Sequence, residues 1–409
     1  MRQWMTLCAV TILAASGIAR AAETSEILRL PNAEATLHVA VPLPAGVAGQ
    51  SGALRLVEID QPDVAVAAQR IPAMAADGTA ADGKSCLAAS IPPRKGAAEE
   101  RQFRVESLPS PEKPAGFRFR ELDDKSLVLE DGDQPVLVYN FGVITDPKVP
   151  KNDPRRGRAC FLDPLYGLNG EVLTESFPKD HYHHHGLFWA WPHILIEGKE
   201  YDLWVDQGIR QRFVRWICRE AGPVAAVLAV ENGWFVGDTK VMIERVWLRA
   251  FRPADGERSL DVEFALIPVG KPITLRGAEG KSYGGLNLRF APRKETLITV
   301  PSGRTKEDLP DTPLAWVDLT AKFQGAPGPS GAAILVDPKQ PGFPPHWLTR
   351  HYGILCCGWP GVKGATLPPG EPVRLDYRVW VHAAAVEPVE LQRAFDGYAA
   401  GKYAVRSTQ

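Results

Sequence analysis

The chain has 409 residues, of which 45% are hydrophobic and 23% are charged, values that are ordinary for globular proteins. This composition excludes a disordered chain, a coiled coil and a polytopic membrane protein. The 47 basic and 48 acidic residues give a formal net charge of −1, so no global field attracts nucleic acid or an anionic membrane.

The first 21 residues have the order of a secretory signal. One positive charge at Arg2 precedes the apolar stretch Thr6–Ser16, and Ala19 and Ala21 supply small side chains before a cleavage point. The apolar stretch is too short to span a bilayer, and no later stretch is long enough either. We therefore expect an exported protein, periplasmic or extracellular, with no membrane insertion.

Residues 22–110 differ in composition from the rest of the chain. They contain no tryptophan, and alternating apolar runs at Thr36–Pro42, Leu54–Asp60 and Gln102–Glu106 are separated by Gly- and Pro-bearing turns. This pattern predicts a small β-sandwich module. The proline-rich stretch Pro109–Gly116 predicts a linker after it.

Residues 117–409 show strand after strand. Asp131-Gly132-Asp133 is a hairpin signal, and apolar residues alternate with polar ones over Leu260–Leu266, which predicts a half-buried antiparallel strand. Only Glu387–Ala399 has the periodicity of a helix. The 36 prolines also favour turns and edge strands. The sequence therefore predicts an all-β protein, a large antiparallel β-sandwich preceded by the small module.

Five cysteines remain after signal cleavage, without metal-binding spacing. We expect Cys86, Cys160, Cys218, Cys356 and Cys357 to be mostly small buried side chains, with one disulfide pair possible.

A histidine cluster stands out in Phe177–His193, which holds five of the nine histidines. If the loop is extended, His181, His183 and His185 point to one side and His184 to the other. Three interpretations stay open: a divalent-metal site with Asp180, His181 and His183 as ligands, acid–base chemistry or sugar contact without metal, and a hydrogen-bonded structural turn. Asp180 could also orient one of the imidazoles.

At these residues the chain resembles a family of secreted proteins labelled "methane oxygenase PmoA". The shared pieces occur in the same order along the chain and are Asp163–Gly167, Phe177–Trp191, Lys281–Phe290, His351–Gly353 and Tyr377–His382. Many family members have arginine in place of His185. The label itself is uninformative, because a membrane oxygenase subunit needs several apolar spans. The resemblance implies a secreted bacterial β-sandwich, similar to the galactose-mutarotase-like supersandwich and associated with sugar metabolism.

Several other side chains suit a sugar site, in which an aromatic platform is combined with hydrogen-bonding groups. Trp191 would share a face with Trp189, beside the histidines. Glu244 alternates with Met242 and Val246, so it is either a carboxylate with a raised pKa or one arm of a salt bridge. Arg155, Arg156 and Arg158 indicate a solvated loop or a contact to an acidic sugar.

The leading hypothesis is an exported enzyme that acts on a carbohydrate, with His183 or His184 and Glu244 as acid–base partners. We expect substrate contacts from the following residues: Tyr166, His181, Trp191, Lys281, Tyr283, Arg289 and His351. Tyr166, His181, Trp191 and one of His183 or His184 should line a single cavity, joined by a residue of Lys281–Arg289 or by His351. We expect no cofactor, except that the histidine cluster could bind a divalent metal. The alternative function is a non-catalytic sugar-binding module.

Overall fold

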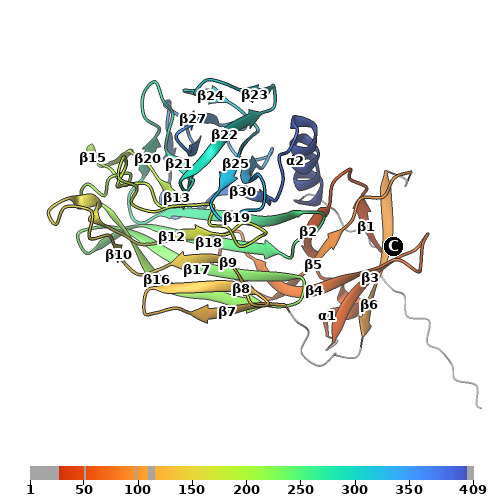
Figure 1. Cartoon of the computed structure of the whole chain (residues 1–409). Helices are drawn as coiled ribbons and strands as arrows, with labels where there is room; N and C mark the ends of the chain where they lie inside the picture. Colours follow the sequence, from red (N-terminus) through yellow and green to blue (C-terminus); the bar gives the residue numbers. More distant parts are fainter. Residues whose placement is uncertain (1–26, 50–51, 97–98, 109–115, 403–409) are drawn as a thin grey trace, which may run out of the picture.

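The computed structural model describes residues 27–49, 52–96, 99–108 and 116–402, which are built almost entirely of antiparallel strands (Figure 1). The all-β prediction is confirmed. The predicted signal, residues 1–21, and all of the predicted linker except Gly116 lie outside the described residues. Among the described residues, no helix is both long and apolar enough to cross a lipid bilayer.

Residues 27–108 form one six-stranded antiparallel sheet, the N-terminal sheet. Alternation places leucine and valine side chains such as Leu56, Val39 and Leu87 in a core of their own. In spatial order its strands are β1 (Ile27–Pro31), β6 (Glu100–Leu108), β3 (Ala53–Glu58), β4 (Ala65–Met74), β5 (Ala80–Ile91) and β2 (Leu37–Pro42), with the short helix α1 (Ala45–Ala48) after β2.

The rest of the chain is a sandwich of two nine-stranded sheets. The first sheet has the order β24 (Thr312–Pro313), β27 (His346–Arg350), β28 (Ile354–Gly358), β21 (Gly285–Arg289), β13 (Leu187–Ala190), β12 (Phe161–Leu165), β9 (Gln134–Asn140), β8 (Ser126–Asp131) and β7 (Phe117–Glu121). The second has the order β16 (Arg210–Ala221), β17 (Ala225–Val236), β18 (Thr239–Phe251), β19 (Glu257–Pro268), β30 (Val373–His382), β26 (Ser330–Val336), β25 (Trp316–Phe323), β22 (Arg293–Val300) and β23 (Gly303–Thr305).

Smaller elements complete the sandwich domain. A four-stranded sheet has the order β15 (Lys199–Tyr201), β14 (His193–Ile196), β20 (Ile273–Arg276) and β29 (Ala365–Leu367), and a two-stranded one joins β10 (Ile144–Thr145) to β11 (Gly157–Arg158). A single 3₁₀ turn covers Pro154–Arg156. Helix α2 (Pro388–Lys402) matches the helix predicted over Glu387–Ala399 and runs slightly further.

The large core lies between the two nine-stranded sheets. Trp189 of β13 packs on Phe264 of β19, with ring centroids 5.0 Å apart, so the side chains of these strands interdigitate. Aligned sheets that bury one face each against the other are the defining feature of a β-sandwich.

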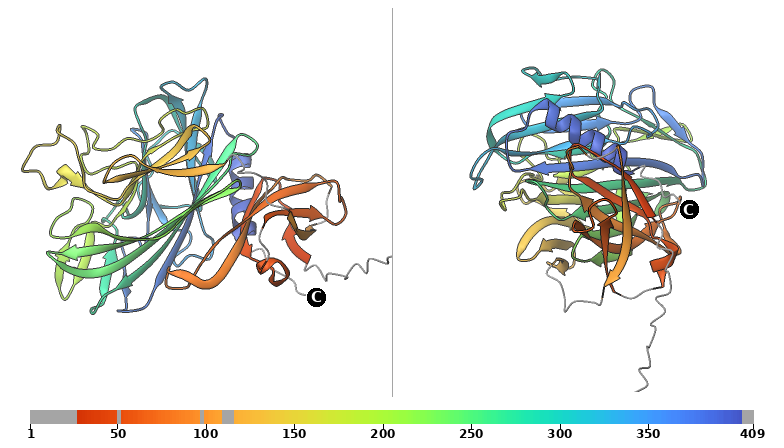
Figure 2. Two further views of the ribbon diagram at one scale, coloured as in Figure 1. Left: turned by 90° about the horizontal axis from the view of Figure 1, so that it is seen from below. Right: turned by 90° about the vertical axis from the view of Figure 1, so that its right-hand side faces the viewer.

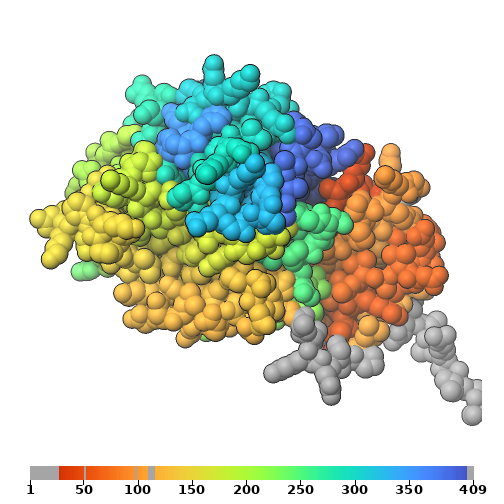
Figure 3. Space-filling view, in the orientation of Figure 1, coloured from red at the N-terminus to blue at the C-terminus, as the bar shows by residue number. Residues whose placement is uncertain are grey.

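The outer face of the second sheet is covered too (Figure 2). Ile71 and Ala88 of the N-terminal sheet pack on Val227 and Trp247, and Leu391 of α2 packs on the neighbouring part of the same face. The space-filling view shows the N-terminal region as a lobe against the sandwich (Figure 3).

This cover corrects one prediction. Strand β19 was expected to be half-buried, but every one of its residues is buried. The polar side chains on its outward face are neutralised by ion pairs beneath the cover: Asp261 pairs with Arg249 and Arg378, and Glu263 pairs with Lys402 of α2. Buried carboxylates are tolerated when they are paired in this way.

Candidate functional site

The histidine loop precedes β13 and is not extended. The His181 N–H donates to the Pro178 carbonyl, and the His184 N–H donates to the His181 carbonyl, each at 3.0 Å, so two turns follow each other. The prediction that His184 points away from His181 and His183 is therefore wrong. Turns replace the two-residue alternation of an extended chain, and they bring these three rings together while His185 faces the interior.

Three aromatic rings form a parallel stack, which we call the imidazole stack. The His181 ring lies between those of His184 and Tyr352, with centroid distances of 4.6 and 5.1 Å and interplanar angles of 3° and 8°. His183 stands edge-on to His184 at 4.6 Å. Tyr352 comes from the turn between β27 and β28, so residues distant in sequence meet here.

A carboxylate holds the central ring of the stack. Asp180 Oδ2 lies 3.0 Å from His181 Nδ1. Arg289 Nη2 donates to Asp180 Oδ1 at 2.9 Å, and the guanidinium carbon of Arg289 lies 5.1 Å from the centre of the Tyr352 ring. Burial would raise the pKa of Asp180, but the contact with His181 and the charge of Arg289 hold this pKa below its usual value. Asp180 is therefore an ionised group in contact with His181, whose Nδ1 has no hydrogen-bond partner among the described residues.

The stack lies over the outer face of the first sheet. Phe188 follows the loop, and Asn287 of β21 and Cys356 of β28 stand directly beside it on the neighbouring strands, pointing to the same face. Trp204 packs on Phe188 at 5.5 Å, and Tyr283 packs on Trp204 at 4.6 Å. Aromatic side chains thus surround the site, and the small polar side chains of Asn287 and Cys356 lie beneath it.

Burial keeps the deeper imidazoles neutral. Desolvation, followed by the charges of His181 and Arg155, lowers the pKa of His183 to about 4. Desolvation also lowers the pKa of His184 well below its usual value. His184 Nδ1 is buried and has no hydrogen-bond partner among the described residues. A neutral imidazole can offer this atom to a ligand.

His185 has a structural environment. It packs between Phe161 and Phe177 at 5.3 and 4.5 Å, and burial lowers its pKa strongly. Of the predicted arginine loop, Arg158 is not solvated: it is 3% exposed and donates to Asp206 and Gln211.

Glu244 is a core residue and not a partner of the histidines. It is fully buried between the two sheets. Its carboxylate accepts hydrogen bonds from Gln211, Asn232 and Trp234 at 2.7, 2.9 and 2.6 Å. It does alternate with Met242 and Val246 as expected, but neutral donors take the place of the predicted arginine. The proposed pairing of Glu244 with His183 or His184 is wrong. Glu244 is hydrogen-bonded to core residues, whereas the two histidines pack on each other in the loop before β13.

Trp191 and His351 also lie elsewhere than predicted. Trp191 is 1% exposed, packs on Trp234 and donates to the Trp359 carbonyl, so it belongs to the core. His351 Nδ1 lies 2.8 Å from Asp308 Oδ1, and its neighbour Tyr352 reaches the stack instead.

Of the remaining predicted residues, two reach the site and two are not in contact with it. Arg289 and Tyr283 reach it, as expected of the segment Lys281–Arg289, whereas Lys281 is exposed on the preceding turn. Tyr166 is half-buried, and burial together with the charge of Asp163 raises its pKa. The sugar-contact roles predicted for these side chains stay predictions.

Three functional candidates were missed. Trp204 had no pattern to mark it, and Tyr352 lies in the shared piece His351–Gly353, where only His351 was assigned a role. Asp163 accepts a hydrogen bond from Thr174 at 2.7 Å, and burial raises its pKa to about 7. Asp163 lies in the shared piece Asp163–Gly167, where only Tyr166 was assigned a role.

The described residues contain no group of three or more histidine, cysteine, aspartate or glutamate side chains arranged to hold a metal ion. The alternative metal site of Asp180, His181 and His183 is thus not assembled. The five cysteines of the described part, Cys86, Cys160, Cys218, Cys356 and Cys357, are all free and buried or half-buried.

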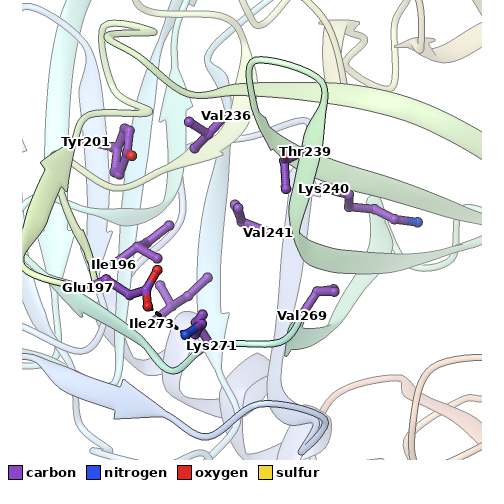
Figure 4. A pocket seen from close by; sticks show the side chains of 10 residues that line it. All are labelled: Ile196, Glu197, Tyr201, Val236, Thr239, Lys240, Val241, Val269, Lys271 and Ile273. Carbon is purple, nitrogen blue, oxygen red and sulfur yellow. Dashed lines mark ion pairs between the residues drawn. The ribbon is translucent and has the colours of Figure 1, made fainter.

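The pocket in Figure 4 lies apart from this site. It has a volume of about 370 Å³ between the β17–β18 hairpin and the four-stranded sheet, and its lining is mostly apolar, including Val236, Val241 and Ile273. Lys271 and Glu197 pair at its rim, 2.7 Å apart. None of the predicted site residues lines this pocket.

Comparison with known proteins gives one family. A model described as "Family of unknown function (DUF6807)" matches residues 126–396, and it carries no methane oxygenase label. No curated protein matches the chain.

Two solved structures show a distant likeness. A protein from the human microbiome named as a kojibiose phosphorylase is 8% identical, with a TM-score of 0.26, covering 63% of this chain and 29% of its own. The aldose epimerase homologue of C. elegans is 9% identical, with a TM-score of 0.28, covering 65% and 99%. The chain thus spans less than a third of the phosphorylase, and TM-scores this low support no argument about activity.

Proposed function

The chain belongs to the DUF6807 family, whose function is unknown, and we propose that it is an exported enzyme that performs acid–base chemistry on a carbohydrate at the imidazole stack. The observation that carries the proposal is the Asp180–His181 pair. A carboxylate oxygen 3.0 Å from Nδ1 places a negative charge beside the ring, and Nε2 is the nitrogen left for a proton transfer to substrate. His184 and Tyr352 clamp the same ring on both faces, which keeps it in one orientation.

The neutral imidazoles can bind the substrate beside His181. Their lowered pKa leaves His183 and His184 uncharged near neutral pH, so they hydrogen-bond a hydroxyl without adding repulsion to His181 when it takes up a proton. In a sugar-ring opening, His181 would remove the proton of the anomeric hydroxyl, a water molecule would protonate the ring oxygen, and His181 would return the proton it had taken to the resulting hydroxide.

A carbohydrate suits the surround of the site. Sugar rings present apolar C–H faces that pack on aromatic side chains, and the partly exposed Tyr283 and Tyr352 offer such surface, while the buried Trp204 packs on Tyr283. Asn287, whose Oδ1 is buried with no hydrogen-bond partner in the described part, suits a hydroxyl.

The test is a screen of the purified protein against oxidised and unmodified glycosides, with product analysis. We expect a product with the wild type and none with His181→Gln, while sugar binding persists. His193→Gln is the matched control, since His193 also faces a carboxylate, Glu200, but lies outside the site. If His181→Gln retains full turnover, the assignment of His181 is wrong.

A non-catalytic sugar-binding module is the second candidate, favoured by the 42% exposure of Tyr352. Exposed aromatic surface suits binding without enclosure of the substrate. Sugar binding that forms no product with any tested glycoside, and that is equal in the wild type and His181→Gln, would establish this alternative.

A further inference from the structure

A second pocket adjoins the imidazole stack, and we call it the trough. Its volume is about 510 Å³, and its lining includes Asn169, Val172, Thr174, Glu175, Pro292 and Gln324. These come from the segment before the histidine loop, from the turn after β21 and from the turn after β25. Pockets of roughly 300–1,000 Å³ commonly hold small ligands.

One chain of ionic contacts joins the trough to the stack. Glu175 Oε1, in the trough wall, lies 2.9 Å from Arg289 Nη2. The same nitrogen lies 2.9 Å from Asp180 Oδ1, and Asp180 in turn contacts His181. Thr174 also bridges to Phe290, the residue after Arg289. Arg289 therefore links the trough to the stack, because it contacts Glu175 of the trough lining and Asp180 beside His181.

The lining of the trough has the chemistry of a sugar subsite. Asn169 and Gln324 are exposed amides, each of which both donates and accepts hydrogen bonds. Val172, 39% exposed, and Pro292 offer apolar surface to C–H groups. The charged residues that line the trough, Glu171 and Glu175, are both acidic, so it disfavours an anionic ligand and suits a neutral sugar unit.

We propose that the trough binds a second, neutral sugar unit, so that the substrate is an oligosaccharide whose reacting unit lies at the imidazole stack. This inference rests on the proposed function and adds the substrate class to it. A bound second unit would also account for the position of Glu175, which orders Arg289 from the trough side.

The experiment measures affinity against ligand length by calorimetry. The ligands are glucose, galactose and galacturonate, each with its di- and trisaccharide. The trough variant is Asn169→Ala with Gln324→Ala, and the control is Thr239→Ala with Lys240→Ala in the separate pocket of Figure 4. These side chains lie at or near the surface, and thermal melting checks that each variant is folded.

We expect at least one neutral series to bind tenfold or more tightly as a trisaccharide than as a monosaccharide. The trough variant should remove this gain and leave monosaccharide affinity within about twofold, and the control should change neither. Equal affinity at every length, or an equal loss for monomer and trimer in the trough variant, overturns the inference and leaves the proposed function intact. A protein that binds no sugar of any length overturns both.

Discussion

At the scale of single residues, the site depends on how differently four adjacent or nearly adjacent histidines are held. His181 is half-exposed and tied to Asp180, His183 and His184 are desolvated and neutral, and His185 packs among phenylalanines. The same side chain therefore has three environments within five positions, and each environment makes a distinct prediction.

Replacement of His181 should separate function from folding. His181→Gln is expected to abolish turnover while changing the free energy of unfolding by less than about 1 kcal/mol, because the ring is partly exposed. His185→Ala is expected to cost about 2–4 kcal/mol, since it leaves a cavity among Phe161, Phe177 and Phe188. Denaturant unfolding and product assays on both variants decide this, and a larger stability loss in His181→Gln would point to a structural role.

Acidification should weaken the fold through His183. Its folded pKa of about 4 lies below the unfolded value near 6.5, so the unfolded chain binds the proton more tightly. The stability contribution is complete above pH 6.5 and is lost as the pH falls toward 4, by up to about 2 kcal/mol at pH 5. We expect His183→Gln to show a shallower fall in unfolding free energy between pH 7.5 and 5. An identical pH profile in the two proteins would contradict the assignment.

Asp163 should make the fold less stable as the pH rises, whereas His183 makes it less stable as the pH falls. Burial raises its folded pKa to about 7, above the ordinary value of 3.8, so its contribution is complete below pH 3.8 and is lost as the pH rises through 7. Asp163→Asn keeps an acceptor for Thr174 and removes the buried charge. The variant should be more stable than the wild type by about 1–3 kcal/mol at pH 8 and nearly equal to it at pH 4. Unfolding free energies at both values test this, and no gain at pH 8 would show that the carboxylate is better solvated than its contacts indicate.

At the scale of elements, the strands and α2 could be predicted because their apolar residues follow simple periods. The histidine loop could not, because turns formed by backbone hydrogen bonds leave no periodic signal around Pro178 and His181. The gathering of His181, Tyr283 and Arg289 was foreseeable, whereas the positions of Trp191 and Glu244 were not. Alternation says which residues share a face, but not whether that face looks toward the core or the site.

Gly186 ends the histidine loop and fixes where the rings lie. Its φ of 60° is unfavourable for other residues, and a Cβ there would lie 2.3 Å from the Leu162 carbonyl oxygen. Gly186→Ala should cost at least about 2 kcal/mol and reduce turnover, because the loop must shift. Gly198→Ala has φ of 79° but open space around the added atom, so it should cost only about 1 kcal/mol. Thermal melts of the pair check the difference, and equal losses would show that strain alone matters.

At the scale of the whole molecule, the N-terminal sheet is part of the sandwich's support. The Trp247 indole donates to the Gly78 carbonyl at 2.7 Å, Gln69 accepts from the Val224 and Ala225 N–H groups, and Arg245 pairs with Asp77. The composition change near residue 110 marked this region, but no sequence pattern showed which face it covers. Because this cover lies on the outer face of the second sheet, both faces of β19 are buried.

A chain that begins at Phe117 should therefore fold poorly. Without the N-terminal sheet, Val227, Ala229 and Trp247 become an exposed apolar patch, which favours aggregation. We expect size-exclusion chromatography to show aggregates, and the full-length protein to melt in a single transition. A monomeric shortened protein with an unchanged melting temperature would contradict this view.

The cover on the second sheet and the imidazole stack lie on opposite sides of the sandwich. The N-terminal sheet and α2 occupy one side of the sandwich, while the imidazole stack lies on the outer face of the opposite sheet. A protein tethered through its N-terminal region would therefore present its site away from the anchoring surface. Immobilisation from that end, on a bead or an electrode, would leave long glycans free to approach.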